Sequence, residues 1–452
     1  MIRRFLFIIL LVDFSNINAQ ICFNPRTNFT VGVNPKAFCI ADFNGDGKKD
    51  IAIAENNGTV AIILGNGLGG FGTATDFPVG VIPNGICSAD FNHDSLADIA
   101  TSDLGPWNVS IIFGDGTGNF GTDSTFGANT PYSIVSADFN RDGNADLAVA
   151  TAYRVLIALG NGAGGFSPVA AYGNGHSYNS IISGDFNGDT IPDLAMSGSS
   201  NMVWTLIGDG LGGFGNAIGY TVGNTPSGVI GADFNGDGKI DLVTANRFSN
   251  DITIYLGDGL GGFGSNINFP AGTGPAALCS ADFDGDGNLD VAVADGSSAN
   301  ISLLQGDGSG NFALPVNYVV DTVPDAITSA DFNGDGKPDL AVLTVYSNID
   351  TGHVAILLNC SSTGINSVSQ QLQPIKIYPN PGKGIFNMEI NSNEINPAHL
   401  EIFNVLGELV YSQNNLQSSI SNKIDLHDLH SGIYIAKIYS SGKIFAQNII
   451  IE

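Results

Sequence analysis

The sequence has few charged residues and very few basic ones. Only 16 of its 452 residues are Lys or Arg, against 43 Asp or Glu, which gives a formal net charge of −27. The charged fraction of 13% is about half of the usual ~25%. Nucleic acids and anionic membranes are bound through clusters of Lys and Arg, so the composition argues against both kinds of partner. Divalent cations are the natural counter-ions of such a chain.

Long hydrophobic runs are also scarce. One run, residues 5–12, follows Arg3 and Arg4 and ends at Asp13, and Ala19 stands at an expected cleavage edge. A membrane-spanning helix needs roughly 20 apolar residues, so residues 1–19 are interpreted as a secretory signal peptide rather than a membrane anchor. No later segment is long enough to span a bilayer, so we expect an exported chain without membrane insertion.

Cysteine is scarce as well, and its five residues occupy two kinds of position. Three of them stand three residues before the Asp of a phrase that recurs along the chain: Cys39, Cys87 and Cys279. Other copies of the phrase have Val, Ile or Thr there, so we expect these three to be buried free thiols that pack like small hydrophobic side chains. Cys22 and Cys360 lie outside this pattern.

Glycine is in excess, with 60 residues, and much of it lies in an internal repeat. A phrase of the general form D-x-N-x-D-G-x-x-D occurs seven times, with its first Asp at positions 42, 90, 138, 185, 233, 282 and 331. The spacing of 47 to 49 residues fits one four-stranded β-propeller blade per repeat, since blade repeats run to roughly 40–50 residues.

Each copy divides into four strands, which in blade 1 are expected at 35–41, 51–54, 59–64 and 71–79. A glycine-rich hairpin joins the last two strands, at 65–70 in blade 1, and it recurs in the next five blades. Glycine allows positive φ in tight turns, and none of these runs opens a helix. They are therefore interpreted as β-turns rather than as phosphate-binding loops.

The two ends of the repeat array fit together. Blade 7 stops after three strands at Cys360, while residues 23–32 match the fourth strand of blade 1, with Phe23 aligned to Phe71. The sequence therefore predicts an all-β, seven-bladed β-propeller closed by the N-terminal strand, without an exposed sheet edge at the junction. The same alignment puts Cys22 and Cys360 on opposite sides of one hairpin turn. In an oxidising compartment they should form a disulfide, and the alternative is two unpaired thiols.

These motifs resemble VCBS or FG-GAP-like repeats, which are related to the seven-bladed propeller of integrin α-chains. The resemblance covers roughly residues 21–360, where the two kinds of phrase alternate in order. A Pro precedes or opens the first strand at equivalent positions in every blade except blade 4, which has Tyr178 there. The resemblance implies the same propeller fold.

The repeated phrase has the composition of a calcium-binding loop. Oxygen-bearing side chains occupy positions 1, 3, 5 and 9, Gly at position 6 allows a sharp turn, and position 7 offers a carbonyl, as in the first part of an EF-hand loop. The alternative is an Asx-rich β-turn without metal, although three convergent carboxylates repel each other unless a cation binds. The predicted Ca²⁺ ligands are Asp42, Asn44, Asp46, Asp50, Asp90, Asn92, Asp94, Asp98, Asp138, Asn140, Asp142, Asp146, Asp185, Asn187, Asp189, Asp193, Asp233, Asn235, Asp237, Asp241, Asp282, Asp284, Asp286, Asp290, Asp331, Asn333, Asp335 and Asp339.

The seven predicted sites are not equal. Blade 6 has four carboxylates because position 3 is Asp284, whereas every other loop has three. Blades 2 and 4 have Ser95 and Thr190 in place of the position-6 Gly, which puts their affinity for calcium in doubt if that position needs a left-handed backbone. The loops hold 22 of the 43 acidic residues. The expected role of the ions is structural, because a bound ion stabilises the folded state.

The sequence favours a binding function over catalysis. The propeller has three His residues and one Glu, and it lacks a G-x-S-x-G or H-E-x-x-H motif. Strand order puts the acidic loops and glycine hairpins on one face and the variable loops on the other. Aromatic residues of the variable loops are candidate ligand contacts, although scattered surface aromatics are also ordinary. These candidates are Trp107, Tyr132, Tyr153, Tyr178, Phe248 and Tyr346.

The C-terminal segment has a different pattern. Residues 361–374 are polar and aperiodic, as in a linker, and residues 375–452 alternate in short strands, which predicts a small immunoglobulin-like β-sandwich. The phrases YPNP at 378–381, NVLG at 404–407 and SGIY at 431–434 resemble the sorting domain of the Bacteroidetes type IX secretion system. The resemblance implies the secretion machinery as a partner; a generic sugar-binding sandwich is the alternative.

The expected organisation is thus a signal peptide at 1–19, a propeller at 20–360, a linker and a sorting domain. We expect a monomer that is secreted or attached to the outer cell surface and binds a glycan or protein ligand in adhesion. A polysaccharide-active lyase or hydrolase that uses the variable face is the alternative.

Overall fold

The structure, a computed structural model, describes residues 21–121, 124–173, 175–320, 322–345, 351–361, 375–378, 381–390, 398–404, 408–416, 422–440 and 443–451. Every regular element among these residues is a β-strand. They fall into two compact units that divide between residues 364 and 365. Within these ranges, no helix long and apolar enough to cross a membrane is found.

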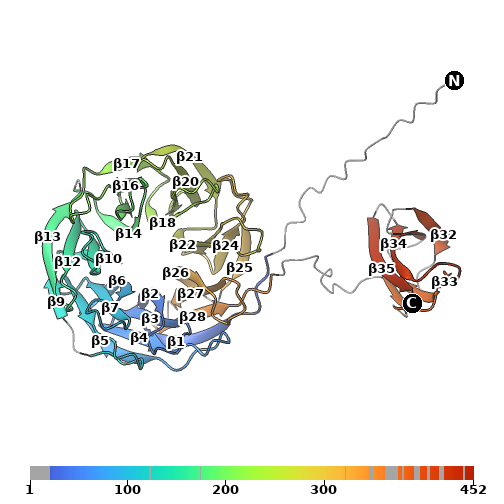
Figure 1. Ribbon diagram of the computed structural model, residues 1–452, viewed down its shortest axis with the longest axis horizontal. Coiled ribbons are helices and arrows are strands. Elements are labelled where there is room, and N and C mark those ends of the chain that lie inside the picture. The colour runs from blue at the N-terminus through green and yellow to red at the C-terminus, as the bar shows by residue number, and fades with distance from the viewer. Residues whose placement is uncertain are drawn as a thin grey trace, which may run out of the picture. The chain divides into compact units, whose positions relative to one another are not determined.

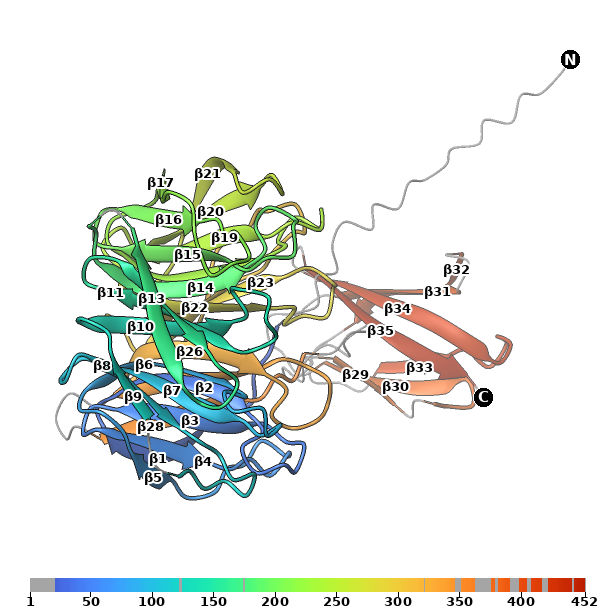
Figure 2. The same ribbon diagram turned by 60° about the vertical axis from the view of Figure 1, so that its left-hand side comes forward.

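The first unit is a ring of four-stranded antiparallel sheets (Figures 1 and 2). Blades 1 to 3 are β2 (Pro35–Ala41), β3 (Asp50–Glu55), β4 (Thr59–Ile63) and β5 (Thr75–Pro78); β6 (Pro83–Ala89), β7 (Asp98–Asp103), β8 (Asn108–Ile112) and β9 (Ser124–Gly127); and β10 (Pro131–Ala137), β11 (Asp146–Thr151), β12 (Val155–Gly160) and β13 (Phe166–Tyr172). Blades 4 to 6 are β14 (Tyr178–Gly184), β15 (Asp193–Gly198), β16 (Met202–Leu206) and β17 (Ile218–Thr221); β18 (Pro226–Ala232), β19 (Asp241–Asn246), β20 (Asp251–Gly257) and β21 (Phe263–Pro270); and β22 (Pro275–Ala281), β23 (Asp290–Asp295), β24 (Asn300–Leu304) and β25 (Val316–Val319).

Blade 7 is built from both ends of the repeat array. It contains β26 (Val323–Ala330), β27 (Asp339–Val345) and β28 (Thr351–Leu357), and its outer strand is β1 (Thr27–Val33). In the antiparallel pair of β1 and β28, Phe29 lies opposite Val354, as Phe77 lies opposite Val60 in blade 1. The seven-bladed propeller closed by the N-terminal strand is therefore confirmed.

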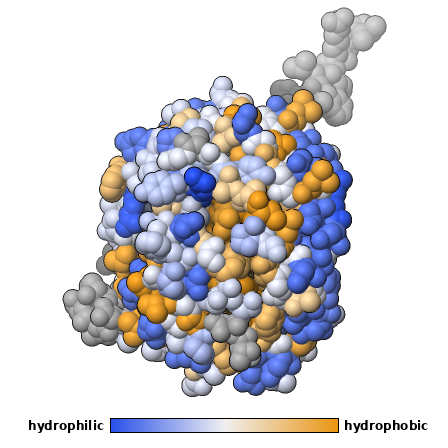
Figure 3. Space-filling view, turned by 90° about the vertical axis from the view of Figure 1, so that its left-hand side faces the viewer, coloured by the Kyte–Doolittle hydropathy of each residue, from blue (hydrophilic) through white to orange (hydrophobic). Residues whose placement is uncertain are grey.

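The second strand of each blade is the most deeply buried, because both faces of its sheet pack against neighbouring blades. All six residues of β3, with the sequence DIAIAE, are buried. Strands covered on both faces have continuous apolar runs, whereas half-exposed strands alternate. The outer strands are more exposed, and Figure 3 shows hydrophobic side chains among hydrophilic ones on the outer rim.

A phenylalanine follows the first Asp of every acidic loop and packs between blades. These seven rings are at most 3% exposed, and each meets, edge to face, a Phe in the last hairpin of the next blade. In the last two junctions the contacts are between Phe283 and Phe23 and between Phe332 and Phe71. These residues thus pack the blade junctions around the whole ring.

The ring closure includes a disulfide between Cys22 and Cys360, whose Cα atoms are 5.2 Å apart. The backbone N–H of Cys360 donates to the Cys22 carbonyl, and that of Asn24 donates to the Leu358 carbonyl.

Cys39, Cys87 and Cys279 are free thiols, and burial raises the pKa of Cys39 and Cys279 to about 12. Thiols with such a high pKa stay protonated and unreactive in the folded protein.

The second unit is a sandwich of two antiparallel sheets. One sheet has the order β29-β30-β33 and the other β32-β31-β34-β35. The strands are β29 (Ile375–Tyr378), β30 (Ile385–Ile390), β31 (Ala398–Asn404), β32 (Leu409–Leu416), β33 (Asn422–Asp425), β34 (Gly432–Ser440) and β35 (Lys443–Ile451). Phe386 and Met388 of one sheet share a buried core with Leu400 and Ala436 of the other. Parts of the first two sorting-domain phrases, residues 379–380 and 405–407, lie outside the described residues.

Candidate metal loops and ligand face

The acidic loops, called metal loops below, all lie at one end of the blades. Each one joins the first and second strands of its blade, and the glycine hairpin that joins the third and fourth strands lies at the same end. The remaining turns, between second and third strands and between successive blades, form the opposite face. The metal loops comprise residues 42–50, 90–98, 138–146, 185–193, 233–241, 282–290 and 331–339.

Each metal loop is folded around its own acceptor side chains. In blade 1, Asp42 accepts hydrogen bonds from the backbone N–H groups of Gly45 and Gly47, at 2.8 Å each. Asn44 accepts one from Asp46, and Asp46 accepts one from Lys48. These bonds bend the loop so that the side chains at positions 1 and 3 lie near one another, and the same pattern recurs in the other blades.

Position 6 has a left-handed backbone in all seven loops. The five glycines have φ between 79° and 92°, and Ser95 and Thr190 take up the same conformation with φ of 68° and 67°. The left-handed requirement suspected from sequence is therefore real. Blades 2 and 4 meet it with residues that disfavour this conformation, so their loops keep the shape at a cost in free energy.

Gly336, at position 6 of blade 7, offers a direct test of this backbone requirement. An added Cβ would meet nothing within 4 Å, so Gly336→Ala changes only the cost of φ = +81° and should lower the free energy of unfolding by roughly 1–2 kcal/mol. Gly127→Ala is the matched control, because its Cβ also enters open space while its φ is not positive. Urea denaturation of both variants measures the difference, and equal stabilities would contradict the argument.

The Asp at position 9 ties each metal loop to the adjacent hairpin. In blade 1, one carboxylate oxygen of Asp50 accepts from the N–H of Phe43 at 2.9 Å and the other from Gly65 at 2.7 Å. All seven position-9 side chains are fully buried and make the equivalent pair of bonds. Burial raises the pKa of Asp98, Asp146, Asp193 and Asp339 to about 6, and that of Asp290 to about 7.

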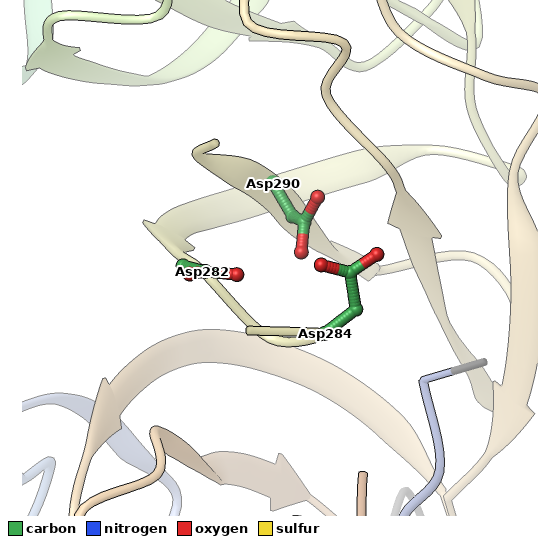
Figure 4. Close-up of side chains that lie close together, drawn as sticks. All are labelled: Asp282, Asp284 and Asp290. Atoms are coloured by element: carbon green, nitrogen blue, oxygen red, sulfur yellow. The ribbon is translucent and has the colours of Figure 1, made fainter. Parts of the chain in front are cut away.

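The blade-6 loop brings three carboxylates together. Oxygens of Asp282, Asp284 and Asp290 all lie within 4.8 Å of one another, and Figure 4 shows Asp284 and Asp290 facing each other. Asp284 is 2% exposed, and it accepts hydrogen bonds from the Gln305 side chain and from the backbone N–H of Asp286, both at 3.0 Å. Buried carboxylates that share a site repel each other, and a cation relieves that repulsion. The all-oxygen donor set therefore fits Ca²⁺.

The other metal loops show no such cluster among the described residues, because position 3 is Asn there. In all seven loops the position-5 carboxylate turns toward position 7 and accepts its backbone N–H. Asp46 forms an ion pair with Lys48 at 2.9 Å, and Asp237 forms one with Lys239 at 3.2 Å. The expected convergence of positions 1, 5 and 9 is thus not seen. Positions 1, 3 and 9 are the set that the blade-6 loop brings together, and in the other blades this set contains two carboxylates and an Asn.

The six aromatic residues predicted to contact a ligand fall into four groups. Trp107, Tyr153 and Phe248 are exposed on the opposite face, at 55%, 66% and 73%. Tyr132 is half-buried in β10. Tyr178 is fully buried at the start of β14, in a core cluster between blades 3 and 4, so the prediction that it belongs to an exposed surface was wrong. Tyr346 lies outside the described residues.

The structure adds a cavity that sequence reasoning did not predict, although Tyr132, one of the six predicted aromatic residues, lines it. On the opposite face, the starts of all seven first strands line a cavity of about 440 Å³ whose wall includes Lys36, Asn84, Asn179 and Asp325. Arg247, from the turn after β19, also lines it. Most of these residues directly follow the Pro, or Tyr178 in blade 4, at the start of the first strand, a position called the Pro slot below. Arg247 belongs to a turn. A comparison of the repeats at that one position would have found most of them.

Comparisons with known proteins agree with this architecture. Residues 42–101, 138–196, 185–244, 233–293 and 282–342 match the FG-GAP-like repeat, and together they cover more than half of the chain. Residues 376–452 match the secretion system C-terminal sorting domain. The chain is also 34% identical over 96 residues to ulvan lyase NLR42 of Nonlabens ulvanivorans, a match that covers 21% of this chain and 17% of the relative.

Among solved structures, the propeller resembles BBS1N in its complex with ARL6DN. Lead- and mercury-soaked crystals of that complex give TM-scores of 0.53 and 0.54 at 14% identity. The first match covers 76% of this chain and 98% of BBS1N, and the second 75% and 97%. At this level of identity, the likeness shows a shared fold.

Proposed function

This chain belongs to the family of FG-GAP-like repeat proteins, and on that basis we propose that it is a calcium-stabilised binding module that recognises a glycan or protein ligand outside the cell. Its C-terminal domain directs export through the type IX secretion system to the cell surface or the extracellular space. The secretion machinery is therefore one partner.

The observation that carries the proposal is the backbone position of Trp107. The residue before the third strand is left-handed in blades 1, 2, 4 and 5, where it is Gly58, Trp107, Asn201 and Asn250. Gly and Asn tolerate this conformation, whereas Trp does not favour it, and its ring is 55% exposed. A strained backbone that presents an exposed aromatic ring is typical of a functional site.

Support for calcium comes from the family and from the blade-6 cluster. FG-GAP-like repeats often bind calcium, and Asp282, Asp284 and Asp290 supply an oxygen-only donor set. In this proposal the ions hold the metal loops and the blade junctions rigid, and the opposite face contacts the ligand.

A Trp107→Asn variant tests the binding proposal without disturbing the fold, because Asn occupies the equivalent position in blades 4 and 5. We expect the wild-type chain to bind a defined set of ligands on glycan and matrix-protein arrays, and Trp107→Asn to lose roughly tenfold in affinity. Leu211→Asn is the control, since Leu211 is 80% exposed on a hairpin of the metal-loop face. No ligand for the wild-type chain, or equal loss in both variants, would contradict the proposal.

A polysaccharide lyase or hydrolase is the second candidate. The similarity to ulvan lyase NLR42 favours it, although that match spans less than a fifth of the relative. Incubation of the chain with polysaccharides and measurement of new reducing ends separates the two candidates. Turnover that requires residues of the opposite face would replace the binding proposal with catalysis.

A further inference from the structure

One ring of residues distinguishes the seven otherwise similar blades. The residue after the Pro slot at the start of each first strand lines the central cavity on the opposite face. Going round the ring, these residues are Lys36, Asn84, Tyr132, Asn179, Ser227, Ala276 and Asp325. The metal loops repeat closely, whereas this position carries charged, amide, aromatic, hydroxyl and methyl groups. The ring therefore gives the cavity an asymmetric set of polar groups.

The next residue along each first strand is always small, which leaves the cavity open below the ring. These residues are Ala37, Gly85, Ser133, Ser180, Gly228, Ala277 and Ala326. Neighbouring first strands come so close that a Cβ on Gly85 would lie 2.9 Å from the Cα of Ser133. The cavity volume of about 440 Å³ falls within the roughly 300–1,000 Å³ of small-molecule sites.

The charges of the cavity are positive on balance. Lys36 and Asp325 form an ion pair at 3.9 Å, so they largely offset each other. Arg247 also lines the cavity, and its guanidinium makes no hydrogen bond or ion pair with the part of the chain that the structure describes. An unpaired Arg at a cavity is notable in a chain with 16 basic residues and a net charge of −27. A planar guanidinium matches the two oxygens of a carboxylate.

The remaining polar groups suit hydroxyl groups of a ligand. Asn179 is exposed, and its amide offers a donor and an acceptor. The amide of Asn84 donates to the Tyr132 carbonyl at 3.0 Å, which leaves its oxygen as an acceptor. The Ser227 hydroxyl donates to the Pro275 carbonyl at 2.8 Å and keeps its lone pairs. Donors and acceptors on the wall of a cavity fit a polyhydroxylated molecule better than an apolar one.

We infer that this cavity binds an acidic sugar residue, with Arg247 holding its carboxylate and the Asn84, Asn179 and Ser227 side chains holding its hydroxyl groups. The inference rests on the proposed binding function and names its ligand class. Apolar ligands do not match the polar ring. Cations are disfavoured by Lys36 and Arg247.

The test uses the full chain in calcium buffer, with methyl glucuronoside as the probe and its neutral methyl ester as the matched control ligand. Saturation-transfer NMR titrations should give an affinity about tenfold or more higher for the acid than for the ester. Arg247→Gln should remove that preference. Leu260→Ser is the control variant, because Leu260 is 82% exposed on a hairpin of the metal-loop face and does not line the cavity.

Equal binding of acid and ester, no binding of the acid, or an unchanged preference in Arg247→Gln would overturn the inference. Loss of the preference in Arg247→Gln together with retention in Leu260→Ser would support it. The array experiment on Trp107 separates this outcome from the binding proposal itself. If array ligands bind through Trp107 while Arg247→Gln leaves the preference for the acid unchanged, the binding function is supported and the acidic-sugar site is refuted.

Discussion

Removal of calcium is expected to lower the melting temperature of the chain by roughly 10–20 °C. One ion at a hundred times its dissociation constant stabilises the folded state by about 2.7 kcal/mol, and each kcal/mol moves the melting temperature of a large domain by roughly 2 °C. Several occupied loops together account for the expected shift. Calorimetry in EGTA, followed by addition of excess calcium, measures the loss and its recovery. Identical melting in both conditions would contradict calcium binding by the metal loops.

The blade-6 loop allows a sharper version of this experiment. Asp284→Asn gives it the Asn that the other six loops have at position 3. The change removes one of three clustered carboxylates, so the metal-free protein should become more stable while calcium stabilises it less. Asn333→Asp in blade 7 is the matched reverse change and should have both opposite effects. If the metal-free and calcium-loaded forms shift in parallel, position 3 does not bind the ion.

The pH dependence of stability should also differ in sign between the metal-free and the calcium-loaded protein. Burial raises the pKa of Asp290 to about 7, above the ordinary value of 3.8, so in the metal-free state folding favours the protonated side chain. Its contribution to stability is present at low pH and is lost as the pH rises from about 4 to 7. Calcium binds the deprotonated form, so its stabilising effect grows over the same range. Melting temperatures at pH 5 and pH 7.5, with EGTA and with calcium, should therefore diverge as the pH rises.

The fold could be predicted almost completely, because one assignment of strands and turns has to fit all seven copies of the repeat. The match of residues 23–32 to 71–80 fixed the closing strand, and the structure places Phe23 opposite Asn359 as it places Phe71 opposite Gly65. In blade 7 the third and fourth strands come from opposite ends of the repeat array, so no glycine hairpin joins them, and Asn359 replaces one of its contacts. Its side chain donates to the Phe283 carbonyl at 2.9 Å, where the hairpins of blades 1 to 6 use a glycine N–H. A single sequence does not reveal such a replacement before the contact is seen.

The candidate site was harder to predict, because the exposure and the contacts of its residues depend on how the blades pack and not on residue type alone. Tyr178 occupies the Pro slot of blade 4, and the prolines in that slot are buried in the other blades, so its burial follows from the position and not from its residue type. The second hydrogen bond of Asp50, from Gly65, depends on the approach of two loops that are separate in sequence. The ring around the central cavity depends on all seven blades at once, and no single repeat contains it.

Loss of the disulfide between Cys22 and Cys360 is expected to be the largest effect of any change outside the metal loops. The bond closes a loop with a sequence separation of 338 residues, for which chain entropy alone predicts roughly 4–5 kcal/mol. A Cys22→Ser/Cys360→Ser double variant should therefore melt about 8–10 °C below the wild-type chain. Reductant should lower the melting temperature of the wild-type chain toward that of the variant and leave the variant unchanged.

In the double variant, stability should be lost first in the closing strand β1 and only then in the whole propeller. β1 keeps its antiparallel pairing with β28 in the variant, so the propeller still folds, but the end of β1 is then held by hydrogen bonds alone. Amide exchange of residues 27–33 should become much faster than that of β2, because β2 does not belong to the blade that the disulfide closes. Peptide mapping without reductant should recover Cys22 linked to Cys360, with Cys39, Cys87 and Cys279 modified only after unfolding. Equal exchange in β1 and β2, or another cysteine pair, would mean that the ring is not closed by this bond.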